Sequence, residues 1–265
     1  MKKAFARLLL LVASLTFIFS CTSGKEVELS SRAMAALDAN QPGVAVSILT
    51  DILVKYPKSK QVEEALFQRA LIYSLYMSKY MNAVNDYREL LKRFPKGERA
   101  MESQLQIARI YEFKLDNCAR AIVEYYRLIT AFETVVDDDK HQYRIAECYY
   151  KLLQLEQAKI EYRALIERYP ASDLVDDSYF QLAGITQARG QLPEAERAWR
   201  NFLIRYPEGE LFLDAKFNLA ATLEEDEKLE KALELYQEIF DKYDNKEMVS
   251  WRIEKVRDRI KSRGR

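Results

Sequence analysis

Small and large apolar positions recur along most of the chain at a constant interval. An aromatic residue closes each interval, and successive aromatics are 37 or 38 residues apart: Tyr56, Phe94, Phe132, Tyr169, Tyr206 and Tyr243. Eleven residues before each aromatic stands an alanine, and this second alanine series is Ala45, Ala83, Ala121, Ala158, Ala195 and Ala232. Twelve or thirteen residues earlier lies a first alanine series: Ala33, Ala70, Ala108, Ala146, Ala183 and Ala220. A fixed period of this length is typical of proteins built from stacked repeats.

Within each repeat the apolar spacing is helical. A large residue follows the second-series alanine by four positions, as Leu49, Tyr87, Tyr125, Tyr162, Trp199 or Tyr236. Spacings of three and four place side chains on one face of an α-helix. Prolines follow four of the closing aromatics, at Pro57, Pro95, Pro170 and Pro207, where each ends one helix pair. We therefore predict an all-α solenoid of about six helix pairs over residues 26–245.

The repeats resemble the tetratricopeptide repeat, which joins a small residue, an Ala-x3-aromatic element and a proline. Three repeats match closely: Ala83 and Tyr87 with Pro95, Ala158 and Tyr162 with Pro170, and Ala195 and Trp199 with Pro207. The first repeat is the weakest, because Leu49 replaces its aromatic. The resemblance implies a right-handed α-solenoid of tetratricopeptide-like helix pairs with a period of 37–38 residues.

A different helix follows, and residues 246–265 are predicted to form a basic capping helix and tail. Its apolar stripe is predicted to contain Met248, Trp251, Val256 and Ile260. The segment holds eight Lys and Arg residues against three acids, and its basic face includes Arg252, Lys255, Arg259 and Arg263. Terminal repeats need a cap over the exposed end of the stack. The basic face is interpreted as solvated, with contact to an acidic partner or anionic headgroups as the alternative.

The first residues predict a targeting segment that precedes the fold. Lys2, Lys3 and Arg7 lead into an apolar run over residues 8–19, which is too short to cross a membrane and is typical of a signal peptide over 1–20. Ile18 to Cys21 resembles the lipobox of bacterial lipoproteins. The resemblance implies that Cys21 carries acyl chains such as palmitate, and that residues 21–25 form a short tether. The alternative is an ordinary signal peptide with Cys21 as a spare thiol.

Motifs for catalysis and cofactor binding are absent from the sequence. It contains no phosphate-binding glycine loop, no nucleophile elbow and no H-E-x-x-H metal motif. His141 is its only histidine and is expected at the surface, near the start of a helix. We therefore expect no enzyme, no cofactor and no metal site. Lysine and arginine together number 41, as do aspartate and glutamate, which argues against nucleic-acid binding. No small-molecule substrate is expected.

Two further cysteines belong to neighbouring predicted repeats. Cys118 opens the second helix of the third repeat, and Cys148 lies late in the first helix of the fourth. Antiparallel packing about a turn near residues 133–137 makes a disulfide between them geometrically feasible, and an oxidising compartment would preserve it. The alternative is two small core residues.

The first helices of such repeats line a concave face, which in tetratricopeptide proteins often binds extended peptides. Residues three before, one after and four after the first-series alanine form a stripe beside the packing face. The candidate groove is Phe67, Leu71, Arg109, Tyr143, Tyr150, Phe180 and Phe217. Its aromatics and arginine are typical of binding hot spots, although the same rings can instead be buried between repeats.

A lipidated cysteine followed closely by repeats that carry Tyr-Pro-x-Ser at residues 56–59 and 169–172 resembles the BamD family. These are outer-membrane lipoproteins of the β-barrel assembly machinery. The resemblance implies a lipid-anchored scaffold on the periplasmic face of the outer membrane, which binds unfolded β-barrel precursors and the barrel assembly protein. Scaffolds associated with Tol-Pal and cell division, or with polysaccharide export, are the alternatives. An envelope hydrolase is a further one.

Overall fold

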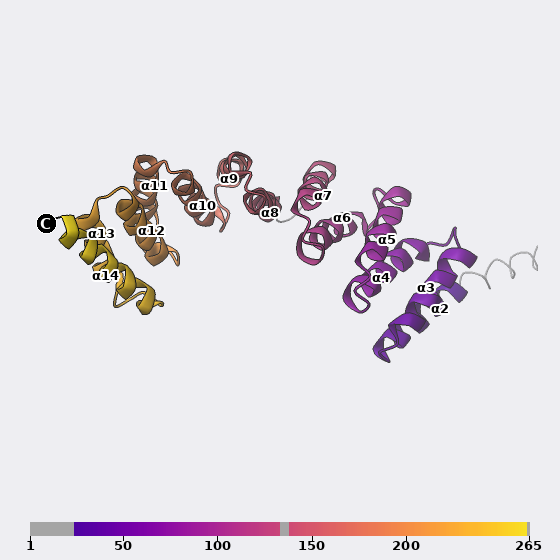
Figure 1. Ribbon diagram of the computed structural model, residues 1–265. Coiled ribbons are helices and arrows are strands. Elements are labelled where there is room, and N and C mark those ends of the chain that lie inside the picture. Colours follow the sequence, from indigo (N-terminus) through magenta and orange to yellow (C-terminus); the bar gives the residue numbers. More distant parts are fainter. Residues whose placement is uncertain (1–23, 133–137, 264–265) are drawn as a thin grey trace, which may run out of the picture. The chain divides into compact units, whose positions relative to one another are not determined.

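The computed structural model describes residues 24–132 and 138–263. All regular elements in these two ranges are helices, which confirms the predicted all-α fold (Figure 1). The signal segment and Cys21 lie outside the described residues. The chain divides into two compact units between residues 135 and 136, and each unit is described by itself. No helix in the described part of the chain is both long and apolar enough to span a bilayer.

Unit 1 contains three successive helix pairs. The first joins α2 (Lys25–Asp38) to α3 (Pro42–Lys55), and the second joins α4 (Gln61–Leu75) to α5 (Tyr80–Arg93). In the third, α6 (Ala100–Arg109) continues into a π-helical turn, η1 (Ile110–Lys114), before α7 (Cys118–Ala131). Within this unit, α3 also packs against α4 and α5 against α6, so each of these two second helices contacts the first helix of the next pair.

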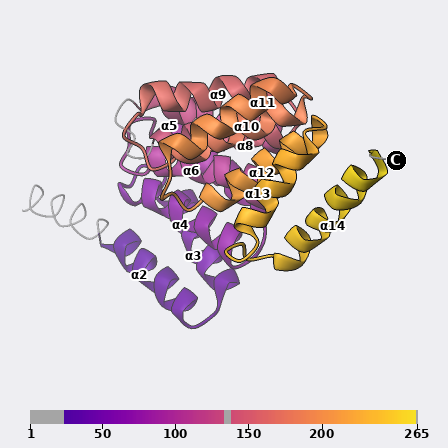
Figure 2. The same cartoon turned by 90° about the vertical axis from the view of Figure 1, so that its left-hand side faces the viewer.

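Unit 2 repeats this arrangement and adds a final helix. Its pairs are α8 (Asp138–Lys151) with α9 (Leu155–Arg168), α10 (Val175–Ala188) with α11 (Leu192–Arg205), and α12 (Phe212–Glu225) with α13 (Leu229–Ile239). The last helix, α14 (Lys246–Arg263), packs against α13 (Figure 2). Both units therefore have the stacked helix pairs of an α-solenoid.

The core of each unit lies where the two alanine series meet. Every alanine of both series is at most 1% exposed. Their small side chains let neighbouring helices approach closely, and the large residue one turn later fills the adjacent space. Five of these large side chains, from the second repeat to the sixth, are among the largest fully buried ones: Tyr87, Tyr125, Tyr162, Trp199 and Tyr236. The predicted small-large pattern is therefore the packing pattern of the fold.

Each turn within a helix pair contains one residue with a left-handed backbone, immediately before the second helix's N-cap. Gly190 fills this position in the fifth pair, with φ of 71°. The other pairs use non-glycine residues, namely Asn40, Ser78, Asp116, Leu153 and Glu227, with φ between 47° and 61°. A side chain at positive φ is disfavoured. Asn and Asp adopt this region more readily than other side chains, so the repeated turn geometry holds Leu153 and Glu227 in particular against their own preference.

The variable period also has its origin in these turns. In the first, fourth, fifth and sixth pairs the N-cap amide donates to a carbonyl five residues earlier, as Gln154 does to Tyr149 at 3.0 Å. In the second and third pairs the acceptor lies six residues earlier: Lys79 donates to Tyr73 at 2.8 Å and Asn117 to Tyr111 at 2.7 Å. The extra residue of the 38-residue repeats is thus absorbed after the first helix, in the third pair by the π-helical turn.

The apolar stripe of α14 differs from the predicted one. Val249, Ile253 and Val256 are the buried residues, with Ile260 partly buried against the same core. These positions are spaced by four, three and four, which keeps them on one helical face. Val256 and Ile260 were predicted correctly. Trp251 was placed wrongly, because its side chain is 52% exposed and lies on the opposite face.

Candidate functional site

The predicted aromatic stripe of the first helices packs onto aromatics of the second helices. In four pairs the residue three before the first-series alanine meets the large residue of its own repeat. Ring centroids are 5.8 Å apart for Phe67 and Tyr87, 5.5 Å for Tyr143 and Tyr162, 4.9 Å for Phe180 and Trp199, and 5.4 Å for Phe217 and Tyr236, all edge to face. Such pairs stabilise a core beyond the area they bury. The main contribution of the stripe is therefore to the packing of each helix pair.

The seven candidate groove residues differ in how accessible they are. Phe67 is only 2% exposed and belongs to the core of unit 1, so burial between helices is correct for this ring. Leu71, Tyr143, Phe180 and Phe217 are half-buried, whereas Arg109 and Tyr150 are exposed. Phe67, Leu71 and Arg109 belong to unit 1, and the other four to unit 2. The accessible part in unit 2 consists of Tyr150 and the edges of three rings on α8, α10 and α12.

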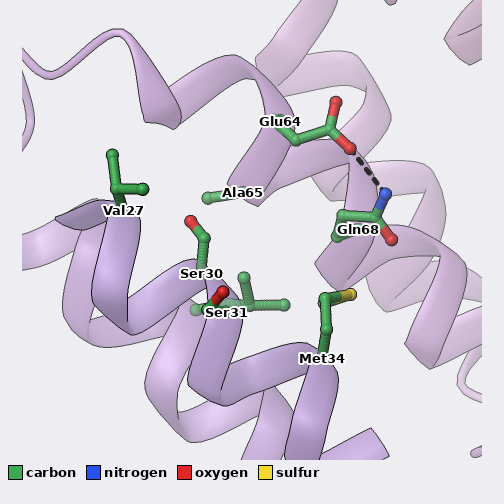
Figure 3. A pocket seen from close by; sticks show the side chains of 8 residues that line it. Val27, Ser30, Ser31, Met34, Glu64, Ala65 and Gln68 are labelled. Atoms are coloured by element: carbon green, nitrogen blue, oxygen red, sulfur yellow. Dashed lines mark hydrogen bonds between the residues drawn. The ribbon is translucent and has the colours of Figure 1, made fainter.

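Unit 1 has a hollow between α2 and α4, which are the first helices of its first two pairs (Figure 3). Val27, Ser31 and Met34 of α2 face Ala65 and Gln68 of α4 across it, and the hollow measures about 290 Å³. Met34 follows its first-series alanine by one position, as Leu71 and Arg109 do. The sequence rule for the stripe thus includes Met34, and also Ser30, which lies three residues before Ala33 and lines the same hollow. The remaining lining residues have no counterpart in the rule.

Unit 2 has a larger and acidic hollow where α10 and α12 begin. It measures about 830 Å³, and its lining includes five carboxylates, Asp173, Asp176, Asp177, Glu208 and Glu210, and one cation, Arg205. Burial raises the pKa of Asp177, and the neighbouring charges of Asp176, Glu147 and Glu210 raise it further. Burial and the nearby carboxylates Glu147 and Asp177 likewise raise the pKa of Tyr143. This end of the first-helix face therefore favours cationic side chains.

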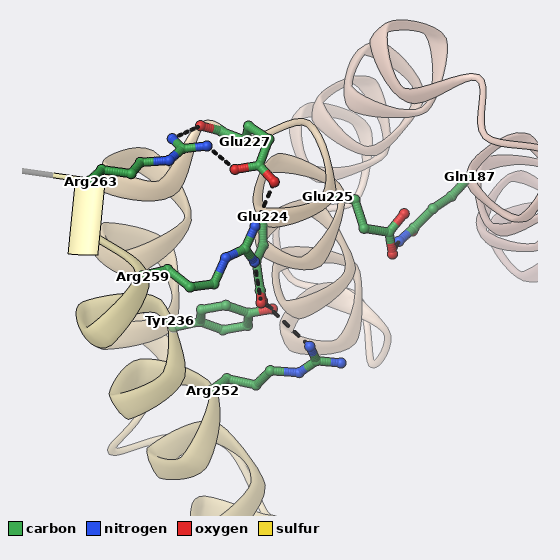
Figure 4. A network of polar contacts seen from close by, with 8 residues as sticks. All are labelled: Gln187, Glu224, Glu225, Glu227, Tyr236, Arg252, Arg259 and Arg263. Carbon is green, nitrogen blue, oxygen red and sulfur yellow. Dashed lines mark hydrogen bonds and ion pairs between the residues drawn. The ribbon is translucent and has the colours of Figure 1, made fainter. Parts of the chain in front are cut away.

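The predicted basic face of α14 is largely neutralised by the protein itself (Figure 4). Arg252 and Arg259 reach the carboxylate of Glu224 at 3.4 and 3.1 Å, and Arg259 also reaches Glu227 at 2.7 Å. Arg263 pairs with Glu227. The Tyr236 hydroxyl donates to Glu224 at 3.1 Å. Three of the four predicted cations thus attach the cap to α12 and to the turn that follows it, while Lys255 Nζ lies 5.9 Å from the ring centroid of Trp251.

The thiol and imidazole groups of the described residues are buried. Cys118 and Cys148 are buried thiols, each within its own unit, and this arrangement matches the alternative of two small core residues. A disulfide between them stays a prediction. His141 was expected at the surface, but it is only 6% exposed. Over residues 24–132 and 138–263, no three His, Cys, Asp or Glu side chains are grouped so that they can hold a metal ion.

Comparisons with known proteins agree on the repeat type. Tetratricopeptide-repeat models match residues 64–97, 142–172 and 186–246. No curated protein matches the chain by sequence. Among solved structures, a tetratricopeptide repeat protein from Parabacteroides merdae superposes with a TM-score of 0.54 at 17% identity, over 83% of this chain and 80% of that one.

Two further solved structures show the same fold. MamA superposes with a TM-score of 0.54 at 14% identity, over 72% of this chain and 96% of that one. PilW, described as a type IV pilus biogenesis factor, has a TM-score of 0.50 at 18% identity, over 84% of this chain and 97% of that one. The matched segments, together with helix pairs built on two buried alanine series, show that the chain contains tetratricopeptide repeats.

Proposed function

We propose that this protein is a lipid-anchored scaffold on the periplasmic face of the outer membrane, and that it binds protein segments during β-barrel assembly. Tetratricopeptide repeats generally mediate protein–protein interactions, which supports a non-enzymatic binding role. The observation that carries the proposal is the first-helix face of unit 2. There the exposed ring of Tyr150, 38% accessible, accompanies half-buried aromatic edges on α8, α10 and α12, and the acidic hollow of about 830 Å³ lies at the start of α10 and α12.

The chemistry of this face favours an extended segment with aromatic and basic side chains. Aromatic edges offer apolar contact, and the carboxylates around the hollow offer charge pairing with Lys or Arg. The anchor rests on the lipobox-like sequence that ends at Cys21. A membrane-bound scaffold needs no helix across the bilayer, because more than one acyl chain is enough for stable attachment.

Peptide binding can be tested without knowing the natural partner. The probe is an extended peptide, fluorescein-Tyr-Lys-Tyr-Arg-Tyr-amide, whose fluorescence anisotropy is followed as the purified chain is added. Tyr150→Ala is expected to weaken binding by about fivefold to tenfold, in line with loss of one exposed anchor. Tyr76→Ala is the matched control, because this exposed tyrosine lies at the end of α4 in unit 1. Equal affinity of the two variants would refute the assignment of this face.

The envelope pathway needs a separate experiment. Crosslinking in intact cells followed by purification from outer membranes should recover a large β-barrel assembly protein. Recovery of Tol-Pal components or of polysaccharide-export machinery would instead assign the scaffold to those pathways. Incorporation of labelled palmitate that is lost in Cys21→Ser would establish the anchor, and labelling that survives this substitution would exclude it.

A further inference from the structure

Unit 2 has a further pocket among its second helices, and this pocket shares Arg205 with the acidic hollow. It lies between α9 and α11, its floor is α10, and it measures about 590 Å³. Leu182 and Ala183 from the floor and Ala198 and Phe202 from α11 supply an apolar lining. Ile204, at the pocket, is 79% exposed. We call this hollow, with these residues and the cations described next, the second-helix pocket.

All charged side chains that line the second-helix pocket are cationic. They are Lys159 and Arg163 on α9 and Arg205 on α11, and no carboxylate is among the described lining residues. Arg205 donates to the Tyr179 hydroxyl at 3.2 Å, and its guanidinium carbon lies 4.7 Å from that ring's centroid. Lys159 is 3.9 Å from Glu156, one helical turn earlier and outside the pocket. An apolar floor with cations around it is complementary to an acidic ligand that has an apolar side chain.

The earlier repeats show what this position ordinarily holds. The third residue after the second-series alanine is Ile48 in the first repeat and a carboxylate in the next three, namely Asp86, Glu124 and Glu161. Glu124 on α7 pairs with Arg88 on α5 at 3.0 Å, so the groove between these two second helices contains its own ion pair. Asp86 on α5 pairs with Arg69 on α4 at 2.6 Å. In both repeats a carboxylate of the chain itself neutralises an arginine.

In the second-helix pocket that carboxylate is missing. Ala198 occupies the position of Glu124, and Arg163 occupies the position of Arg88. The last repeat differs in another way: Leu235 takes the place of Ala198, and Leu223 takes the place of Thr186 on the floor. The corresponding arginine there, Arg200, pairs with Glu196 of its own helix at 2.9 Å. The small residue Ala198 therefore leaves both space and positive charge at this one groove.

We propose that the second-helix pocket binds an acidic segment of a partner protein, in which a carboxylate pairs with Arg163 and an adjacent aliphatic or aromatic side chain enters the apolar floor. The partner's carboxylate takes the place that Glu124 has in the third repeat. Charge complementarity selects this occupant, because a basic segment would meet three cations. The site is additional to the first-helix face and requires neither the lipid anchor nor the function proposed above.

The probe for this pocket is acetyl-Glu-Leu-Glu-Phe-Glu-amide, with acetyl-Gln-Leu-Gln-Phe-Gln-amide as its neutral match, in calorimetric titrations of the purified full chain. Wild-type protein is expected to bind the acidic peptide at least about tenfold more tightly than the neutral one. Ala198→Glu restores the carboxylate of the third repeat and should abolish this preference. Arg163→Ala should also reduce affinity about tenfold, whereas Arg168→Ala, on the same helix but outside the pocket, should not.

Circular dichroism and thermal melts establish whether each variant is folded. If Ala198→Glu does not fold, the affinity of Arg163→Ala for the acidic peptide still tests the proposal. Equal binding of the two peptides, or binding that Ala198→Glu and Arg163→Ala leave unchanged, would overturn the proposal. Sedimentation velocity adds a further decisive readout. If the chain self-associates and Ala198→Glu abolishes the association, the occupant is a second copy of the chain and the proposal of an acidic partner is overturned.

Discussion

Arg69 donates to both carboxylate oxygens of Asp86, at 2.8 and 2.6 Å, and thereby joins the first helix of the second repeat to its second helix. The side chains are 17% and 11% exposed. Arg69 also donates to the Thr50 hydroxyl at 2.9 Å, so this single guanidinium connects α3, α4 and α5. Polar pairing between helix pairs thus accompanies the apolar packing of unit 1.

The first prediction concerns this ion pair. Asp86→Ala leaves the guanidinium of Arg69 largely buried without its carboxylate, and we expect a loss of about 3 kcal/mol in the free energy of unfolding. Urea titration followed by circular dichroism measures it. Asp51→Ala is the control, because Asp51 forms an exposed pair with Lys55 within one helix. That change should cost less than about 0.5 kcal/mol. Similar losses in both variants would contradict the assigned role.

The second prediction concerns the left-handed residues in the turns. Leu153 has φ of 58° and an 82% exposed side chain, so its backbone is disfavoured and its side chain packs little. Leu153→Gly is expected to stabilise the protein by about 0.5 to 1 kcal/mol. The reverse change, Gly190→Ala at φ of 71°, should destabilise it by a similar amount. Thermal unfolding measures whether Leu153→Gly raises stability and Gly190→Ala lowers it. A loss of stability in Leu153→Gly would show that the backbone of Leu153 is not strained.

The third prediction concerns pH. Burial and neighbouring acids raise the pKa of Asp177 in the folded state. The folded state therefore binds this proton more tightly than the unfolded chain, and stability falls as pH rises from the unfolded pKa through the folded one. Asp177→Asn removes this cost. We expect its melting temperature to exceed that of wild type at pH 7 and the difference to shrink as pH falls below the unfolded pKa.

A suitable control for the pH experiment is Asp173→Asn, an exposed carboxylate of the same hollow. It should change the melting temperature less, because its charge keeps more of its hydration. A melting-temperature gain for Asp177→Asn that is equal at pH 7 and at low pH would show that the effect does not come from ionisation.

The fourth prediction concerns attachment of the cap. Glu224 accepts from Tyr236, Arg252 and Arg259, and its side chain is only 9% exposed (Figure 4). Glu224→Ala should cost about 2 kcal/mol and should lower hydrogen-exchange protection in α14 before it does so in α10. Glu225→Ala is the matched control, since this neighbouring carboxylate is exposed and accepts from Gln187 instead. Uniform loss of protection across unit 2 would argue against a local role.

Positions with a strict periodic requirement could be predicted from sequence alone. Few other residue types fit where two helices touch or where a large ring fills the space one turn later. The predictions for both alanine series and for the large buried residues were therefore correct. The cap was harder, because Met248 and Trp251 are as apolar as Val249 and Ile253. Packing selected Val249 and Ile253 because they share one face with Val256 and Ile260.

The candidate site was less accessible to sequence reasoning for a related reason. The spacing that lines a concave face also directs a ring toward the second helix of the same repeat. Phe67 and Phe180 occupy the same position in the repeat pattern, although Phe67 is buried and Phe180 is half-buried. The left-handed turn residues have no shared residue type. The second-helix pocket did have a signal in the sequence. At the third position after each second-series alanine, Ala198 is the small residue among Ile48, Asp86, Glu124, Glu161 and Leu235.

The turn within each helix pair accepts either of two lengths while the helices on both sides keep their buried faces in phase. The residue added in the longer turns leaves both the preceding and the following helix with the same face turned toward the core. One additional residue is accommodated in the turns that contain Ser78 and Asp116. Because these turns accept either length, repeats of different length can follow one another in the same stack.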